Sequence, residues 1–485
     1  MEEMDSASAP SFVNSPARPY YVKRRRLDDV SRSFDHWNST RGGNPMSDRP
    51  VSAALHERAT AVMPGGNTRL TVYMKPYPYY AALGKGCRLT DVDGVERLDF
   101  TNNYNSLIHG HAHPAITDAV QEQLTRGTAF PMATEAEIRL AELLCDRVPS
   151  FEQVRFCNSG SEGVMFAIKA ARAYTDRPKI AKCEGSYHGS YDFAEVSLDP
   201  TPATWGNSDP KSVAYTKGTP QSVLDNVVVI PFNKPDEAER ILRENAADLA
   251  CVVVDLMPNR GGLIPATPEF IAMLNRVRHD TGVLIVLDEV ITLRLDYAGA
   301  QSLFKLTPDL TGLGKIIGGG FPVGAVAGTA EVMAVFDPRG GKPDLSHSGT
   351  FNANPITMVA GETAMRLLTR KEIDRLGALG DRARTGITDA MREKEFPGQV
   401  TGLGSLFRIH VHNRPLSDYR SSMMTQDEED RLAAIVGYMR DHGVFVNDRG
   451  VCSLSTPMGD VEIDAFLDCF KAALTATHGI TNAAE

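Results

Sequence analysis

Two short segments near the middle of the chain most strongly restrict how it can fold. Ala250–Asp255 and Val283–Asp288 are uninterrupted apolar runs, and each ends in an acid. A continuous apolar run, in place of strict alternation, is typical of a strand that is buried on both faces of a parallel sheet. Phe270–His279 lies between the two runs and has helical spacing. The sequence therefore predicts an α/β domain built on a mainly parallel sheet.

Predicted strands and helices also alternate before and after this central region. Val154–Cys157 and Ile180–Cys183 are predicted strands, and Glu162–Tyr174 is the predicted helix between them. After about residue 365, helices such as Lys371–Lys394 and short strands such as Leu406–His412 predict a smaller α+β domain. The expected division is a disordered extension (1–45), an N-terminal segment (46–100), a large domain (101–365) and a small C-terminal domain (366–485). The extension is rich in Ser, Pro, Asn and Arg, which cannot bury enough apolar surface to order itself.

Composition excludes several classes of protein. The net charge of −10 over 485 residues disfavours a nucleic-acid binder, which usually carries a basic excess. The apolar runs are far shorter than the roughly 20 residues of a membrane helix, so no membrane partner is expected. Seven cysteines without a CxxC pair predict neither a zinc site nor a disulfide framework, and they favour a cytoplasmic location. The alternating His109, His111 and His113 lack an HExxH helix, so no metal is predicted.

Ligands of doubly wound sheets bind at the carboxyl ends of the strands, so the polar residues there are the first candidates. Asp288 closes a predicted strand; a helix cap or a structural ion pair explains it equally well. Lys315 lies among glycines, and its apolar neighbours could lower its pKa. Both properties suit a lysine that forms a Schiff base, although a solvent-facing loop lysine is the alternative interpretation.

A strand-to-helix junction offers a third candidate. Ser159, Gly160 and Ser161 place small and hydroxylated residues where a helix begins. Backbone N–H groups at such a terminus, together with hydroxyl groups, suit a phosphate, although an ordinary N-cap has the same composition. Tyr187 and His188 occupy the turn after the next strand, where the ring of Tyr187 could stack on a planar ligand or simply pack.

In combination, the order and spacing of these signals are specific. A phosphate turn, an aromatic residue, Asp288 and, 27 residues later, Lys315 resemble the fold-type I enzymes that use pyridoxal 5′-phosphate, and more narrowly the class III aminotransferases. The resemblance covers roughly residues 50–480. The motifs that carry it are Met63–Gly66, Gly110–Pro114, Arg155–Glu162, Gly185–Gly189, Leu287–Thr292, Pro308–Gly324 and Gly349–Pro355.

The resemblance implies a large domain with a mainly parallel sheet and a smaller α+β domain made from the N- and C-terminal segments. It implies that Lys315 holds the cofactor as a Schiff base and that Asp288 pairs with the pyridine nitrogen. It also implies a homodimer with shared active sites, in which Thr350 completes the phosphate site of the second subunit. The residues expected to bind the cofactor are Ser159, Gly160, Ser161, Tyr187, His188, Asp288, Lys315 and Thr350.

The implied activity is a ping-pong transfer of an amino group from a small-molecule donor to a 2-oxo acid acceptor. Gly65–Arg69 resembles β-phenylalanine aminotransferases, in which arginines matching Arg69 and Arg449 bind the substrate carboxylate. There are two alternatives to a β-amino acid aminotransferase: glutamate-1-semialdehyde 2,1-aminomutase and a protein that binds pyridoxal phosphate without turnover. The chain departs from the family at Asp255, which with the next residue replaces a usual Glu-Pro, and in the atypical loop Pro258–Gly262.

Overall fold

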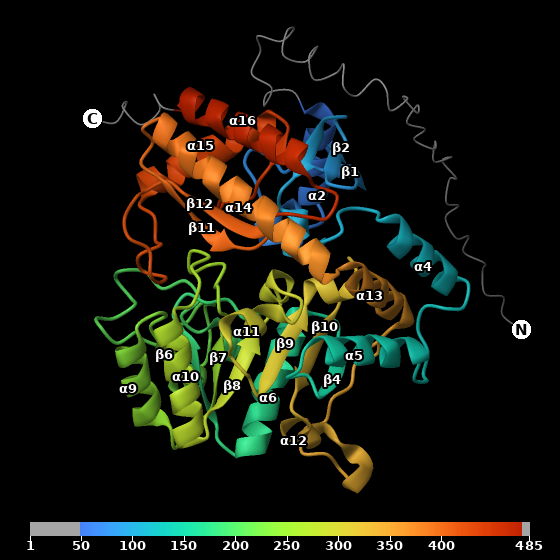
Figure 1. Cartoon of the computed structure of the whole chain (residues 1–485), viewed down its shortest axis with the longest axis vertical. Helices are drawn as coiled ribbons and strands as arrows, with labels where there is room; N and C mark the ends of the chain where they lie inside the picture. The colour runs from blue at the N-terminus through green and yellow to red at the C-terminus, as the bar shows by residue number, and fades with distance from the viewer. Residues whose placement is uncertain (1–48, 478–485) are drawn as a thin grey trace, which may run out of the picture. The chain divides into compact units, whose positions relative to one another are not determined.

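A seven-stranded sheet in the order β4-β10-β9-β8-β7-β5-β6 forms the largest layer of the chain (Figure 1). The computed structural model describes residues 49–477, so the expected extension at 1–45 lies outside the described residues. All neighbouring pairs from β9 to β6 are parallel, and only β10 runs antiparallel to its two neighbours, which confirms a mainly parallel sheet. The strands are β4 (Gln153–Cys157), β5 (Lys179–Cys183), β6 (Val227–Ile230), β7 (Leu249–Val254), β8 (Leu284–Asp288), β9 (Leu310–Gly314) and β10 (Gly324–Gly328).

Both faces of this sheet are covered by helices, which explains the continuous apolar runs. In β7, Cys251 and Val253 pack in the cluster that contains α6 (Gly160–Thr175). The alternate residues Val252 and Val254 pack in a second cluster with two other helices. Those helices are α9 (Pro235–Asn245) and α10 (Pro268–Thr281), which lie side by side in Figure 1. The strand is therefore apolar at every position because both of its faces are buried.

Several of the glycines on either side of Lys315 lie in strands and not in a loop. Gly312 and Gly314 belong to β9, and Gly324 opens β10. The reason is the close approach of α6. A Cβ atom on Gly312 would lie 2.6 Å from the side chain of Val164, and one on Gly324 would overlap the carbonyl group of Ser159. These glycines let the first turn of α6 approach the strand ends.

Of two further small sheets, one joins N-terminal and C-terminal strands. β13 pairs in parallel with β3, with Val444 opposite Leu98, so the N-terminal segment and the C-terminal part build one sheet. This confirms a smaller α+β domain from both ends; its boundaries at 100 and 365 stay predictions. The first sheet has the order β1-β2-β3-β13 and consists of β1 (Ala81–Lys85), β2 (Arg88–Asp91), β3 (Glu96–Asp99) and β13 (Val444–Phe445). The second contains β11 (Gln399–Leu403), β12 (Leu406–His410) and β14 (Val451–Ser453).

Three long helices lie beside the small sheets in Figure 1: α14 (Arg370–Glu393), α15 (Gln426–Asp441) and α16 (Asp460–Thr477). Helix α14 packs on β11 and β12, α15 packs on β13, and α16 packs on both α14 and α15. Within residues 49–477, no helix combines the length and the apolar character that crossing a membrane requires. The remaining α-helices are α2 (Pro50–Thr60), α3 (Asn102–Asn105), α4 (Pro114–Leu124), α5 (Glu135–Arg147), α7 (Asp192–Glu195), α8 (Gln221–Asp225), α11 (Gly299–Phe304), α12 (Ala330–Met333) and α13 (Pro355–Leu367). Short 3₁₀ turns are η3 (Pro64–Gly66), η4 (Leu70–Val72), η5 (Thr292–Leu295), η6 (Lys315–Gly318), η7 (Ala334–Phe336) and η8 (Pro338–Gly340).

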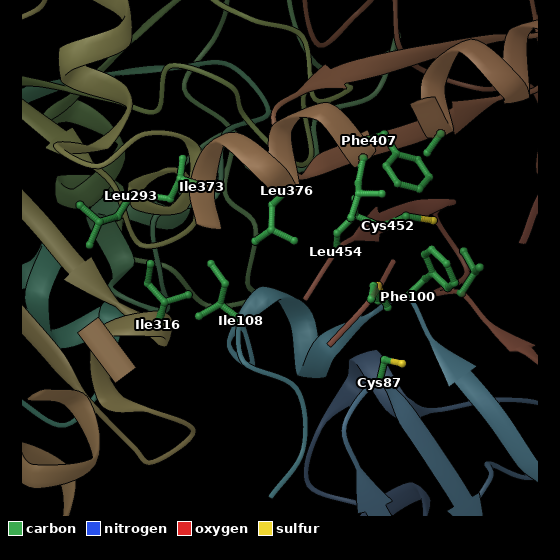
Figure 2. Close-up of a cluster of buried hydrophobic side chains, with 14 of the residues drawn as sticks. Cys87, Phe100, Ile108, Leu293, Ile316, Ile373, Leu376, Phe407, Cys452 and Leu454 are labelled. Atoms are coloured by element: carbon green, nitrogen blue, oxygen red, sulfur yellow. The ribbon is translucent and has the colours of Figure 1, made fainter. Parts of the chain in front are cut away.

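One apolar core connects the large sheet to the C-terminal part. Figure 2 shows Ile316, which follows Lys315, in the same cluster as Ile373 of α14 and Phe407 of β12. All three side chains are buried. The segment that carries Lys315 packs on α13, and its Ile316 belongs to an apolar cluster that extends to α14 and β12.

Replacing Gly163 by alanine should destabilise the fold. An added Cβ in the first turn of α6 would lie 2.5 Å from the carbonyl oxygen of Ala325 in β10, so α6 or the strand must shift. We expect a loss of about 1–3 kcal/mol in the free energy of unfolding. The control Gly377→Ala lies inside α14 with no atom within 4 Å of the new Cβ, and it should stabilise the helix by about 0.5–1 kcal/mol. Denaturant unfolding followed by circular dichroism measures both, and equal midpoints for the two variants would contradict the close approach.

Candidate active site

The ends of three neighbouring strands bring an amine and two carboxylates together. Val254 of β7 lies opposite Leu287 of β8, so Asp255 and Asp288 follow as neighbours. Asp288 in turn lies opposite Gly312 of β9, and Lys315 is the first residue after this strand. The register of the parallel sheet thus places all three side chains at its carboxyl edge, where ligands of such sheets bind.

These side chains face one cavity of about 370 Å³. Its wall contains every cofactor residue expected from the sequence except Thr350. The lining residues are Asn103, Ser106, Asn158, Ser159, Gly160, Ser161, Val164, Tyr187, His188, Gly189, Asp255, Asp288, Val290, Ile291, Lys315, Gly320, Phe321, Pro322 and Val323.

The start of α6 forms part of the wall of this cavity. Ser159 is the N-cap residue, and its hydroxyl oxygen accepts a hydrogen bond of 3.1 Å from the backbone N–H of Glu162. The backbone is tightly enclosed: a Cβ on Gly160 would lie 2.8 Å from the side chain of Val290, and one on Gly189 would lie 2.6 Å from Ser161. Helix N–H groups, two hydroxyls and small residues together suit a phosphate group.

Asp288 is fixed by two donors. One carboxylate oxygen accepts a hydrogen bond of 2.9 Å from Nδ1 of His188, and the other accepts one of 3.0 Å from the backbone N–H of Val290. His188 is fully buried, and burial lowers its pKa, so the imidazole is neutral with its proton assigned to Nδ1. Its Nε2 has no hydrogen-bond partner within residues 49–477. His188 therefore orients the carboxylate of Asp288 and holds it as an acceptor at the cavity wall.

Lys315 combines a strained backbone with an enclosed amine. Its φ of 49° lies in the left-handed region, which residues other than glycine rarely adopt. Burial lowers the pKa of its amine, and the nearby Asp288 and Asp255 oppose this shift. A lowered pKa increases the fraction of neutral amine, which is the nucleophilic form.

Asp255 is a site residue that the sequence analysis did not assign. Burial, followed by the neighbouring Asp288 carboxylate, raises the pKa of Asp255 to about 8, although the backbone N–H of Met257 and the amine of Lys315 act in the opposite direction. Burial and the neighbouring carboxylate therefore favour the protonated form of this carboxyl group. The signal was present in the sequence, because Asp255 closes a continuous apolar run in the same way as Asp288.

The other predicted residues lie around the cavity. Tyr187 is in the wall and keeps 46% of its surface exposed, so one face of its ring is available to a ligand. Thr350 is exposed and lies outside the cavity wall. Arg69 is exposed and donates a hydrogen bond of 2.9 Å to Asn103, which does line the cavity. Arg449 lies in the loop between β13 and β14, outside the wall.

Comparison with known proteins identifies the family. The model of the family described as "Aminotransferase class-III" matches residues 72–474. The chain is a class III aminotransferase. Enzymes of this class use pyridoxal 5′-phosphate, so it is a pyridoxal-phosphate-dependent enzyme, and the phosphate cradle, the carboxylate pair and the enclosed lysine described above fit that cofactor.

Three relatives illustrate the range of this family. An omega-transaminase structure from Sphaerobacter thermophilus is 55% identical, with a TM-score of 0.88 over 90% of this chain and 100% of that one. The structure of a beta-phenylalanine aminotransferase from Variovorax paradoxus is 30% identical, with a TM-score of 0.79 over 93% of this chain and 98% of that one. A glutamate-1-semialdehyde 2,1-aminomutase of Methanothermobacter thermautotrophicus is 38% identical over 427 residues, which cover 87% of this chain and 99% of that relative.

The pH dependence of the free energy of unfolding tests the protonation state of Glu289, the buried acid that follows Asp288. Burial raises the pKa of Glu289 from 4.5 to about 8, and its Oε2 has no partner within residues 49–477. Between about pH 4.5 and 8 the native state keeps a proton that the unfolded state has released, so this group makes stability fall as pH rises through that window.

Glu289→Gln should remove this group's contribution to the loss of stability at high pH, because glutamine mimics the protonated acid. The variant should match the wild type near pH 5 and gain on the order of a few kcal/mol relative to it by pH 9. Unfolding midpoints at pH 5, 7 and 9 measure the difference, and the exposed Glu237→Gln serves as control. A wild-type advantage that grows with pH would refute the protonated state of Glu289.

Proposed function

We propose that the enzyme transfers an amino group from a β-amino acid to a 2-oxo acid in a ping-pong reaction. The position of Arg69 is the observation that supports a β-amino acid as the amino donor. Its guanidinium is fixed by a hydrogen bond to the cavity residue Asn103 and lies 5.1 Å from the ring centre of Tyr104. Within residues 49–477 Arg69 forms no ion pair, so its charge is not neutralised by a carboxylate of the described chain. A planar guanidinium beside the cavity suits a substrate carboxylate, which it can bind through two parallel hydrogen bonds.

Each group of cavity residues would have a different role in the proposed reaction. When bound, pyridoxal 5′-phosphate supplies a carbonyl group that exchanges amino groups and a ring that takes up negative charge from the substrate carbon. Ser159, Gly160 and Ser161 would hold its phosphate, and Asp288 would face its pyridine nitrogen. Lys315, which we propose as the attachment point, has an amine that can accept a proton from the substrate and return it. The apolar enclosure favours the neutral amine that this task requires.

We further propose that the active form is a homodimer in the cytoplasm. Thr350 is exposed and outside the wall of its own cavity, as expected for a residue that completes the phosphate site of a second subunit. All seven cysteines are free thiols, which agrees with a reducing compartment.

The second candidate is glutamate-1-semialdehyde aminomutase, which is favoured by the name of a relative 38% identical to this chain. A panel of amino donors with pyruvate or 2-oxoglutarate as acceptor separates the two candidates. Turnover of β-amino acids supports the proposal, and turnover of glutamate-1-semialdehyde alone would replace it by the aminomutase. No turnover of any donor by the cofactor-loaded protein would favour a binding protein without catalysis.

Replacing Arg69 by alanine should weaken binding of a β-amino acid by about one to two orders of magnitude, since a charge-assisted contact contributes about 1.5–3 kcal/mol. An arylalkyl amine without a carboxylate should bind the variant and the wild type alike. The exposed Arg58→Ala on α2 is the matched control and should change neither affinity. Spectral titration of the loaded enzyme with both amines measures the effect, and an equal loss for both would assign Arg69 a structural role.

A further inference from the structure

Four consecutive residues that follow β3 have a left-handed backbone. Asn102, Asn103, Tyr104 and Asn105 have φ angles of 47°, 47°, 56° and 73°, and they form the short helix α3 as a left-handed turn. The backbone N–H of Asn105 closes this turn with a hydrogen bond of 3.0 Å to the carbonyl oxygen of Thr101. Residues other than glycine adopt this region singly, so a run of four is strained, and such strain occurs most often at functional sites.

Both ends of the left-handed turn are fixed by neighbouring parts of the chain. The carboxylate of Asp99 accepts a hydrogen bond of 2.9 Å from the backbone N–H of Asn102. The side-chain amide of Asn102 donates a hydrogen bond of 2.7 Å to the carbonyl oxygen of Ser453 in β14. At the other end, the guanidinium of Arg294 donates to the carbonyl oxygen of Asn105 at 3.3 Å. These buried contacts hold the strained backbone and so fix the direction of its two middle side chains.

The two middle residues contact the N-terminal segment at the edge of the cavity. Asn103 lines the cavity, and its amide oxygen accepts a hydrogen bond of 2.9 Å from Arg69. Its amide nitrogen donates a hydrogen bond of 3.1 Å to the hydroxyl of Ser106, another residue of the wall. The ring centre of Tyr104 lies 5.1 Å from the guanidinium of Arg69, and the hydroxyl of Tyr104 donates to the carbonyl oxygen of Thr71. An amide and a ring thus hold the guanidinium, and neither carries a negative charge.

We propose that Asn103 is a positioning residue: its amide fixes the guanidinium of Arg69 beside the cavity without neutralising it, so that the enzyme favours amino donors with a carboxylate. The inference rests on the proposed function, in which Arg69 binds the substrate carboxylate. A side chain that is already fixed loses less rotamer freedom when it binds a ligand, which strengthens binding. The left-handed backbone contributes because it directs the side chain of Asn103, and asparagine tolerates this backbone better than most residues.

Calorimetric binding of two unreactive ligands to the cofactor-loaded enzyme tests this role. Phenylpropanoate carries a carboxylate, and phenylpropanamide has nearly the same shape without the charge. The wild type should bind phenylpropanoate about tenfold more tightly than phenylpropanamide, because the carboxylate gains a charge-assisted contact with Arg69. Equal affinities for the two ligands would leave Arg69 without a carboxylate to bind and would overturn the inference.

Two substitutions at position 103 separate positioning from folding. Asn103→Gly removes the amide and keeps the left-handed backbone, which glycine adopts readily. Asn103→Asp keeps the size of the side chain but places a carboxylate where the amide oxygen now lies 2.9 Å from Arg69, so it should neutralise the guanidinium. Phenylpropanoate affinity should fall about three- to tenfold in Asn103→Gly and about tenfold or more in Asn103→Asp, while phenylpropanamide affinity stays within about twofold. Wild-type phenylpropanoate affinity in either folded variant, or equal losses for both ligands, would overturn the inference.

Asp176→Gly is the matched control. Asp176 also has a left-handed backbone, with a φ of 53°, but it is the C-cap residue of α6, at the other end of that helix from the cavity. The control should leave both affinities unchanged. A loss of phenylpropanoate affinity equal to that of Asn103→Gly would show that the effect does not come from the contact with Arg69.

A double-mutant cycle tests whether Asn103 acts through Arg69. In the Arg69→Ala background, Asn103→Gly should change phenylpropanoate affinity by less than about twofold, because the guanidinium that it positions is absent. A loss as large as in the wild-type background would show that Asn103 acts independently of Arg69 and would overturn the inference.

Transamination of a β-amino acid with pyruvate, run in parallel, separates this inference from the proposed function. Turnover of the β-amino acid, together with wild-type phenylpropanoate affinity in the Asn103 variants, would contradict the positioning role alone. A phenylpropanoate preference that depends on Asn103 and Arg69, without turnover of any β-amino acid, would contradict the proposed donor and leave the positioning role standing.

Discussion

The parallel register of β7, β8 and β9 is the constraint on which the site depends. Because Val254 lies opposite Leu287 and Asp288 lies opposite Gly312, the polar residues that close these strands meet at one edge of the sheet. A shift of one residue in any of the three strands would turn the terminal side chain toward the opposite face, since side chains alternate along a strand. The apolar clusters on both faces of the sheet oppose such a shift.

The electrostatic balance of the cavity follows from this placement. Two carboxyl groups and one amine line the same cavity, and Asp288 affects the pKa of both Asp255 and Lys315. Burial and Asp288 raise the pKa of Asp255, whereas burial lowers the pKa of Lys315. The neighbouring Asp288 is held by a hydrogen bond from His188. The site can therefore present one fixed negative charge and one neutral nucleophile in the same small volume.

Local patterns predicted most of this arrangement. Continuous apolar runs predicted the parallel strands, and the small residues at 159–161 predicted a turn that lines the cavity, because both follow from short-range sequence. The strand positions of Gly312 and Gly324 depend on tertiary contacts and were missed. Glycine signals a close approach or a turn equally well, and only the position of α6 decides between them.

The central claim is that Lys315 is the residue to which the cofactor attaches. Borohydride reduction of the loaded enzyme, followed by peptide mapping, tests it most directly. We expect one labelled peptide, with the reduced adduct on Lys315. We also expect that Lys315→Ala keeps cofactor through the cradle at Ser159–Ser161 but yields no labelled peptide. An adduct on another lysine, such as the buried Lys182, would contradict the account.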